Sequence, residues 1–193
     1  DYNIVDMSPT RMFQDYLPPY HAAIDAGAGS VMVALNSING VPATSNTWLM
    51  QDLLRKQWGF KGVAVSDHGA ILELIKHGVA KNEREAATLA IKAGVDMSMN
   101  DLVYGKELPG LIRSGKVPQS DLDNAVREVL GAKYDMGLFK DPYLRIGKVL
   151  DDPADINAES RLHRAEAREV ARKSQVLLKN EAHTLPLNKR ANI

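Results

Sequence analysis

The amino-acid sequence predicts an α/β protein with a parallel sheet, and two features of its apolar residues support this class. Three short apolar runs, at residues 31–35, 63–66 and 95–99, begin roughly thirty positions apart, which is the length of one β-α-β unit. The runs at 31–35 and 63–66 are continuous and do not alternate with polar residues, as is typical of strands that helices cover on both faces. An open doubly wound sheet and a (β/α)8 barrel both fit this pattern, so periodicity leaves that choice open.

Helices are expected between and around the three apolar runs. A serine or asparagine at 45–46 can cap one helix, and Gly59 and Gly94 are placed to end two of them. The segment after Ser120 carries an apolar stripe from Leu122 to Leu130 at helical spacing, which is expected to face the core. The expected helices cover residues 19–26, 45–57, 83–92, 108–113, 120–133 and 158–180.

The composition narrows the classes of partner. Lysine and arginine total 24, as do aspartate and glutamate, so no net charge is available to attract nucleic acid or an anionic membrane. The absence of cysteine excludes disulfides, zinc-thiolate sites and thiol nucleophiles. No apolar run approaches the ~18 residues that a membrane span needs. A small neutral substrate fits this composition better than a charged macromolecule does.

Asp67 is the main candidate for chemistry, because it directly follows the apolar run at 63–66. Parallel α/β proteins place functional groups at the carboxyl ends of their strands. An ionised carboxylate there can attack an electrophilic carbon or accept a proton. Because Gly69 follows two residues later, Asp67 also fits a turn or a helix N-cap. The local pattern alone leaves both interpretations open.

Six short motifs occur in order along the chain: YNIVDMS at 2–8, YLPPY at 16–20, NGVPA at 39–43, WGFKG at 58–62, SDHGA at 66–70 and AGVDM at 93–97. In this order they resemble glycoside hydrolase family 3, and within it most of all the bacterial periplasmic β-glucosidases. The segments VLLKN at 176–180 and LPL at 185–187 resemble the opening of the family's second domain. One such motif would be a weak signal, whereas six in the same order are specific.

The resemblance implies a division of the chain into three parts. Residues 1–136 are expected to form the C-terminal portion of a (β/α)8-type catalytic barrel, and residues 137–157 a linker between domains. Residues 158–193 are expected to begin an α/β sandwich domain with its first helix. We therefore expect the chain to be a fragment of a larger enzyme, whose remaining segments are its first partner.

The resemblance also implies a reaction, the retaining, exo-acting hydrolysis of terminal β-D-glucosyl residues. Asp67 occupies the position of the family's nucleophile, which attacks the anomeric carbon and forms a covalent glycosyl-enzyme that water then releases. This mechanism needs a second carboxyl group to protonate the leaving oxygen. In the family that group is typically a glutamate of the second domain, which would lie beyond Ile193, so the isolated chain is expected to be inactive.

Two further residues are expected to contact the substrate. Met32 lies at the strand position that faces the bound sugar in the family, although ordinary barrel packing is nearly as good an interpretation. His68, where many members carry tryptophan, is expected to line the leaving-group subsite, donate a hydrogen bond there or cap the next turn. Leu35 replaces a tyrosine that in many members hydrogen-bonds the nucleophile, so other groups must hold Asp67.

The remaining candidates are weaker. Asp96 is interpreted as a buried structural carboxylate bonded to backbone amides, and Asp101 as a helix cap. No cofactor is implied by the resemblance. No metal site is expected either, because His68 has no second ligand at a suitable spacing.

Other functions stay open at the level of sequence. The chain could act as a non-catalytic fragment or subunit that completes a partner barrel, or belong to the β-N-acetylhexosaminidase branch of the family, against which the linker and second-domain start argue. A β-glucoside or small oligosaccharide is the expected substrate, with no nucleic acid or membrane partner, and a homodimer is compatible. By resemblance the location is periplasmic or secreted.

Overall fold

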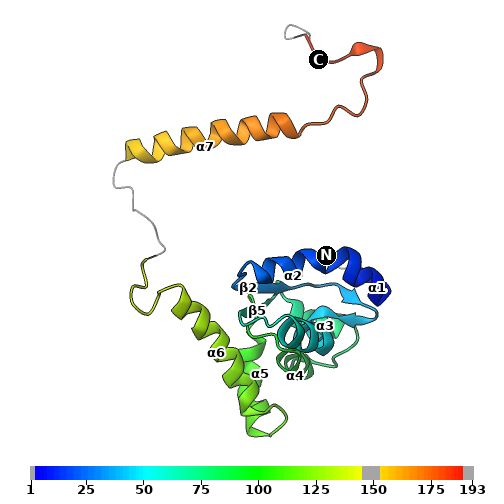
Figure 1. The fold of residues 1–193 in the computed structure, drawn as a ribbon, viewed down its shortest axis with the longest axis vertical. Coiled ribbons are helices and arrows are strands. Elements are labelled where there is room, and N and C mark those ends of the chain that lie inside the picture. Colours follow the sequence, from blue (N-terminus) through cyan, green and yellow to red (C-terminus); the bar gives the residue numbers. More distant parts are fainter. Residues whose placement is uncertain (1–2, 145–152, 189–193) are drawn as a thin grey trace. The chain divides into compact units, whose positions relative to one another are not determined.

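The computed structural model describes residues 3–144 and 153–188, and the chain divides into two compact units, Asp1–Leu144 and Arg145–Ile193 (Figure 1). The first unit combines helices with short, mostly parallel strands, which confirms the predicted α/β class. The barrel and the predicted division into three parts stay predictions, and the part of the expected linker at 145–152 lies outside the described residues.

The central sheet pairs β2 (Ser30–Val33) with β5 (Val63–Ser66) in parallel. Gly62 is required where they meet, because a Cβ there would lie 2.2 Å from the carbonyl oxygen of Gly29. The strand predicted at 95–99 is wrong, because the pairing beside β5 is a single parallel bridge between Val65 and Met97. It stops there because the amide of Met99 donates to a serine side chain of β5 and not to a strand carbonyl.

A second sheet, made of three strands of two residues each, was not expected from the sequence. It runs in the order β1 (Ile4–Val5), β3 (Ser37–Ile38) and β4 (Val41–Pro42), with β1 and β3 parallel and β3 and β4 antiparallel. Asn39 and Gly40 both have positive φ, 50° and 82°, as a tight two-residue hairpin requires. Strands of two residues give too short a pattern to recognise in a sequence.

The helices predicted at 19–26, 83–92 and 120–133 agree with the structure to within two residues at each end, whereas the helix predicted at 108–113 begins earlier, at Val103. The segment predicted as one α-helix at 45–57 is a short 3₁₀ turn followed by a π-helical stretch. The helix α3 was not predicted, because its N-cap residue is Gly69, which has no side chain to give a capping signal in the sequence. The elements are α1 (Pro9–Arg11), η1 (Met12–Tyr16), α2 (Pro18–Asp25), η2 (Ala43–Ser45), η3 (Trp48–Gln57), α3 (Ala70–Lys76), α4 (Glu83–Ala93), α5 (Val103–Arg113) and α6 (Gln119–Asp135).

The core lies on the helical face of the central sheet. Ala64 of β5 packs with Ile71 and Leu74 of α3 and with Leu111 of α5, and all four are fully buried. The small alanines of α4 belong to the same cluster. This packing fixes β5, and with it the loop that follows β5, against α3, α4 and α5.

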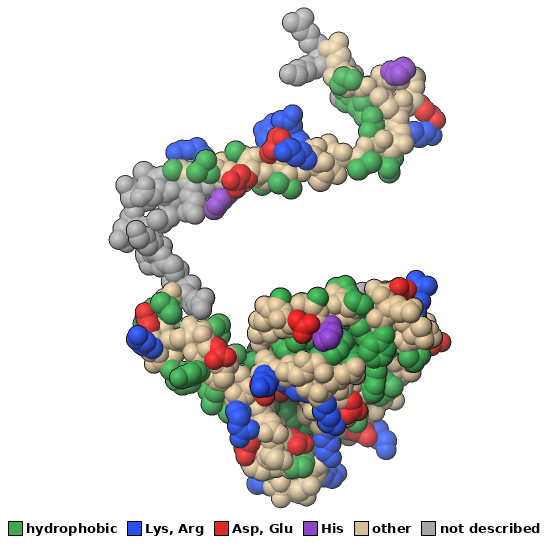
Figure 2. All heavy atoms as spheres, in the orientation of Figure 1, with side chains coloured by type: hydrophobic (Ala, Val, Ile, Leu, Met, Phe, Trp, Pro, Cys, Tyr) green, Lys and Arg blue, Asp and Glu red, His purple; other side chains and the backbone are tan. Residues whose placement is uncertain are grey.

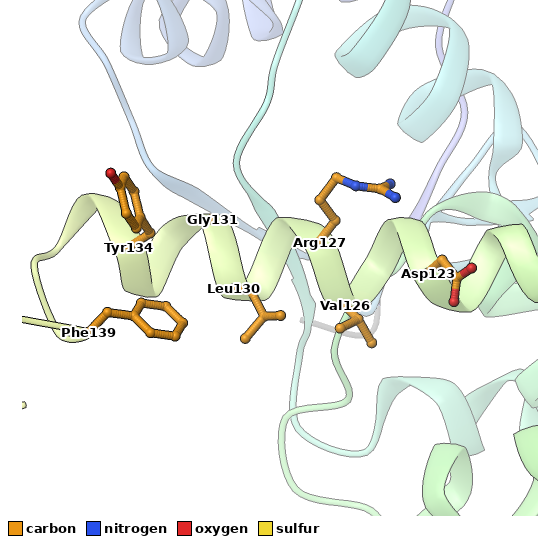
Figure 3. Close-up of a pocket in the computed structure, with 7 residues that line it drawn as sticks. All are labelled: Asp123, Val126, Arg127, Leu130, Gly131, Tyr134 and Phe139. Atoms are coloured by element: carbon orange, nitrogen blue, oxygen red, sulfur yellow. The ribbon is translucent and has the colours of Figure 1, made fainter.

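The apolar stripe predicted for the helix at 120–133 is only partly buried. Ala125 is buried in α6, whereas Val126 and Leu130 are about half exposed and line an open hollow of about 510 Å³. Figure 2 shows apolar atoms exposed on α6, and Figure 3 shows that Tyr134 and Phe139 border the same hollow. None of the residues predicted to bind substrate lines it.

The second unit contains α7 (Pro153–Ser174) and a short turn, η4 (Glu181–His183). The helix predicted at 158–180 therefore begins earlier and ends before the VLLKN segment. Leu162 and Val170 of α7 are both 66 % exposed. Glu169 forms ion pairs with Arg172 and Lys173 one turn along the helix.

Candidate active site

The backbone of Asp67 is fixed at the carboxyl end of β5. Its amide donates to the carbonyl of Val33 in β2 at 3.1 Å, and the amide of Ser66 donates to the carbonyl of Met97 at 2.8 Å. The fully buried Ser66 side chain donates to the carbonyl of Asp67 at 2.9 Å and accepts from the amide of Met99 at 3.1 Å. Two neighbouring segments, β2 and the loop at 97–99, therefore hold the end of β5 where Asp67 lies.

The carboxylate of Asp67 is half-buried and oriented by the turn that it begins. Its Oδ1 accepts a hydrogen bond of 2.6 Å from the amide of His68, a charge-assisted contact. Within the described residues no hydrogen bond reaches Oδ2. One oxygen is thus anchored, while the other is available to a ligand, an arrangement suited to a nucleophile or a base.

His68 is exposed and is held from the side by Asn100. The Nε2 atom of His68 lies 2.7 Å from the Nδ2 atom of Asn100, and the Oδ1 atom of Asn100 accepts from the amide of Gly69 at 2.9 Å. Gly69 has φ of 69°, a left-handed conformation that favours glycine. Asn100 was not predicted as a site residue, although its position just after the third apolar run, at the same end as Asp67, is a signal in the sequence that points to it.

Met32 lies on the same face of the sheet as Asp67. It is in register with Val65, which is itself bridged to Met97, and side chains at Val65 and Asp67 share a face because strands alternate with period two. This face is opposite the helical core, and Met32 is 57 % exposed on it. The sheet therefore places Met32 and Met97, on either side of Val65, on the same face as the candidate carboxylate.

Leu35 plays no part in holding the carboxylate. Its side chain is buried, in keeping with its apolar character. The group that orients Asp67 is instead the backbone amide of the next residue. A backbone amide, that of His68, therefore makes the hydrogen bond to Asp67 that a tyrosine at position 35 was expected to make in other family members.

Asp96 has the structural role that the sequence predicted. Its Oδ2 accepts from the amide of Ala64 at 2.7 Å and pairs with Arg55 at 2.6 Å, and Glu128 lies on the other side of the guanidinium at 3.8 Å. Burial raises the pKa of Asp96 to about 6, although the Ala64 amide and the Arg55 charge act to lower it. Arg55 also donates to the carbonyl of Gly62 at 2.9 Å, so the cluster joins η3 to the sheet.

Asp101 was predicted to cap a helix, but the N-cap residue of α5 is Leu102, one position later. The Oδ1 of Asp101 still accepts from the first helical amide, that of Val103, at 3.1 Å. No three histidine or carboxylate side chains come together as a metal site in residues 3–144 and 153–188. Among the described helices, none has the length and apolar character needed to cross a membrane.

Comparison with known proteins finds a family whose model matches most of the chain. Residues 1–132 match the model described as the N-terminal domain of glycosyl hydrolase family 3. The chain is 64 % identical over 193 residues to a periplasmic β-glucosidase of Salmonella typhimurium, covering all of this chain and 25 % of that protein. It is 40 % identical over 195 residues to a β-xylosidase of Formosa agariphila, covering 95 % of this chain and 26 % of the relative.

A solved structure resembles the chain as well. It is a mutant β-glucosidase from Listeria innocua in complex with laminaribiose, with a TM-score of 0.80 and 46 % identity, and the match covers 98 % of this chain and 26 % of that one. The chain thus spans about a quarter of the length of these relatives.

Proposed function

The chain belongs to glycosyl hydrolase family 3, and from that premise we propose that it carries the nucleophile of a β-glucosidase-type active site. Asp67 is the proposed nucleophile, and the whole protein that carries this chain is the proposed enzyme. The observation that supports this most is the carboxylate itself, which is half-buried at the carboxyl end of β5 and has one oxygen anchored by the amide of His68.

The proposed reaction is a double displacement with retention. The free oxygen of Asp67 attacks the anomeric carbon as the bond to the leaving oxygen breaks, and an acid elsewhere in the whole protein protonates that oxygen. Water then attacks the glycosyl ester, releases the sugar and restores the carboxylate. The acid is expected about 5 to 5.5 Å from Asp67, the separation typical of retaining enzymes.

The proposed substrate is a terminal β-D-glucosyl residue of a small oligosaccharide. Two relatives support this choice, the Salmonella typhimurium β-glucosidase and the Listeria innocua enzyme whose structure holds laminaribiose. The Formosa agariphila β-xylosidase supports xylosides as a second candidate class. A comparison of kcat/KM for nitrophenyl β-glucoside and β-xyloside decides between them, and we expect the glucoside to be preferred.

A periplasmic or secreted location belongs to the same proposal. It is supported by the name of the Salmonella typhimurium relative. Fractionation of cells that produce the whole protein tests it, with activity expected outside the cytoplasm.

Removal and chemical replacement of the carboxylate test the nucleophile. In the whole protein, Asp67→Gly should lower turnover of an aryl β-glucoside by at least about 10³-fold, the scale of a lost covalent catalyst. Added azide can occupy the vacated space, form a C–N bond as the leaving group departs, and give the α-glucosyl azide. Asp52→Ala, at an exposed ion pair, should keep its activity and ignore azide. Full activity of Asp67→Gly, or a β-configured azide product, would contradict the proposal.

A further inference from the structure

The side chain of Asn100 contacts the turn after Asp67 at two points. Its Oδ1 accepts from the amide of Gly69 at 2.9 Å, and its Nδ2 lies 2.7 Å from Nε2 of His68. Asn100 comes from the loop beyond the bridge at Met97 and lies 31 positions from Gly69 in the chain. The contact is therefore tertiary and joins two loops at the same edge of the sheet.

The chemistry of these contacts fixes the protonation of the His68 ring. A backbone amide can only donate, so the asparagine atom facing Gly69 must be its oxygen, and the atom facing His68 must be its NH₂ group. An NH₂ group is a donor, so Nε2 of His68 must accept, and the proton of the neutral ring lies on Nδ1. The amide of Asn100 thus selects one of the two tautomers.

The same turn orients the nucleophile. The amide of His68 donates to Oδ1 of Asp67, and the next amide, that of Gly69, is held by Asn100. On the other side, Ser66 ties the carbonyl of Asp67 to the amide of Met99. Asn100 and Ser66 therefore fasten the turn from both sides to the loop at 97–100.

We propose that Asn100 is a positioning residue that holds His68 as the Nδ1-protonated tautomer and fixes the turn that orients Asp67. This inference rests on the proposed function, since it concerns the same site. With Nε2 engaged by Asn100, the ring atom left for a ligand is Nδ1–H, a donor. His68 therefore recognises an acceptor oxygen, as found in the hydroxyl groups of the sugar on the leaving-group side.

Two substitutions separate the two contacts. Asn100→Asp has nearly the same shape and keeps an acceptor for Gly69, but it presents a second acceptor to Nε2 and so reverses the tautomer that is favoured. Asn100→Ala removes both contacts. Asn124→Asp is the matched control, because Asn124 is an exposed residue of α6 whose side chain contacts Arg127 at 2.8 Å.

The tautomer can be measured without any turnover. In the whole protein labelled with ¹⁵N-histidine, with the His68 signals assigned by their loss in His68→Gln, Nε2 should be unprotonated and Nδ1 protonated. Asn100→Asp should protonate Nε2, and Asn124→Asp should leave the spectrum unchanged. A protonated Nε2 in the unsubstituted protein, or an unchanged His68 signal in Asn100→Asp, would overturn the assignment of the tautomer.

Kinetics test the consequence for substrate. Asn100→Asp should change kcat for a nitrophenyl β-glucoside by less than about threefold, because the turn is kept, and should raise KM for laminaribiose about tenfold, the scale of one lost hydrogen bond. Asn100→Ala should lower kcat as well, by about tenfold. Equal losses with both substrates in Asn100→Asp would overturn the role of His68 toward the leaving group. Failure of the proposed nucleophile would leave the spectrum of His68 unaffected, so the two failures are distinguishable.

Discussion

The loop after β5 and the segment beside it each carry an aspartate, and the two carboxylates have opposite surroundings. Asp67 lies on the sheet face that bears the exposed Met32, whereas Asp96 points to the helical face and is paired with Arg55. The cause is the two-residue alternation of strands: Met97, and not Asp96, is in register with Val65. A carboxylate near a strand end is therefore a candidate for chemistry only when it lies on the open face.

The largest effect on stability is expected at Asp96. Asp96→Ala leaves Arg55 buried without its closest partner and should lower the free energy of unfolding by about 3–5 kcal/mol. Asp52→Ala, which breaks an exposed pair with Lys56, should cost about 0.5 kcal/mol or less. Urea unfolding of the two variants measures the difference. Equal and small losses would show that the cluster around Arg55 does not support the fold.

The pH dependence of stability should also identify Asp96. Its pKa of about 6 in the folded protein is above the ordinary value of 3.8, so the folded state binds the proton more tightly. The stability that this supplies is complete below about pH 4 and is lost as pH rises through 6, a change of about 3 kcal/mol. Asp96→Asn cannot titrate, so the difference between its unfolding free energy and that of the unsubstituted protein should follow this course from pH 4 to 7. A flat difference would contradict it.

A smaller effect is expected on the open face. Met32→Ala should raise KM for a β-glucoside about three- to tenfold, through lost apolar contact with the sugar, and should cost less than about 1 kcal/mol of stability because the side chain is largely exposed. Steady-state kinetics and urea unfolding check the two parts. Met136→Ala, beyond α6, is the control and should leave KM unchanged. A large loss of stability without a change in KM would make Met32 a packing residue.

The smallest effect on stability is expected at Asp67 itself. Asp67→Asn keeps the shape of a side chain whose only hydrogen bond within the described residues is the one from His68. The unfolding free energy should therefore stay within about 0.5 kcal/mol of the original, as for most surface substitutions. Thermal or urea unfolding measures it. A loss comparable to that in Asp96→Ala would remove the contrast between the two carboxylates.

Elements with a strong local signal could be predicted from the sequence. β5, α4 and α6 have continuous apolar runs or helical stripes with recognisable ends, and their predicted positions agree with the structure to within a few residues. The strand at 95–99 was overestimated because an apolar run says nothing about which backbone groups find partners. There the Ser66 hydroxyl accepts the hydrogen bond from the amide of Met99, and the strand pairing ends.

The site could be predicted only in part. Asp67 and His68 directly follow β5, Met32 lies in β2, and the parallel pairing of these two strands brings the two segments together. The ring contact with Asn100 depends on a loop 32 positions away from His68, and neither local pattern nor composition encodes such a distance. For α7 the helix itself could be predicted but the burial of its apolar side chains could not. Within the described residues of its unit, Leu162 and Val170 are exposed and pack against no core.

A mechanism-based 2-fluoro-β-glucoside gives the most direct test of the central claim that Asp67 is the nucleophile. The fluorine slows release of the glycosyl ester, so the whole protein should accumulate a covalent adduct that peptide mapping can locate. The account predicts the label on Asp67, with none in the Asp67→Asn variant. A label on Asp96 or Asp101, or an unchanged adduct in Asp67→Asn, would contradict it.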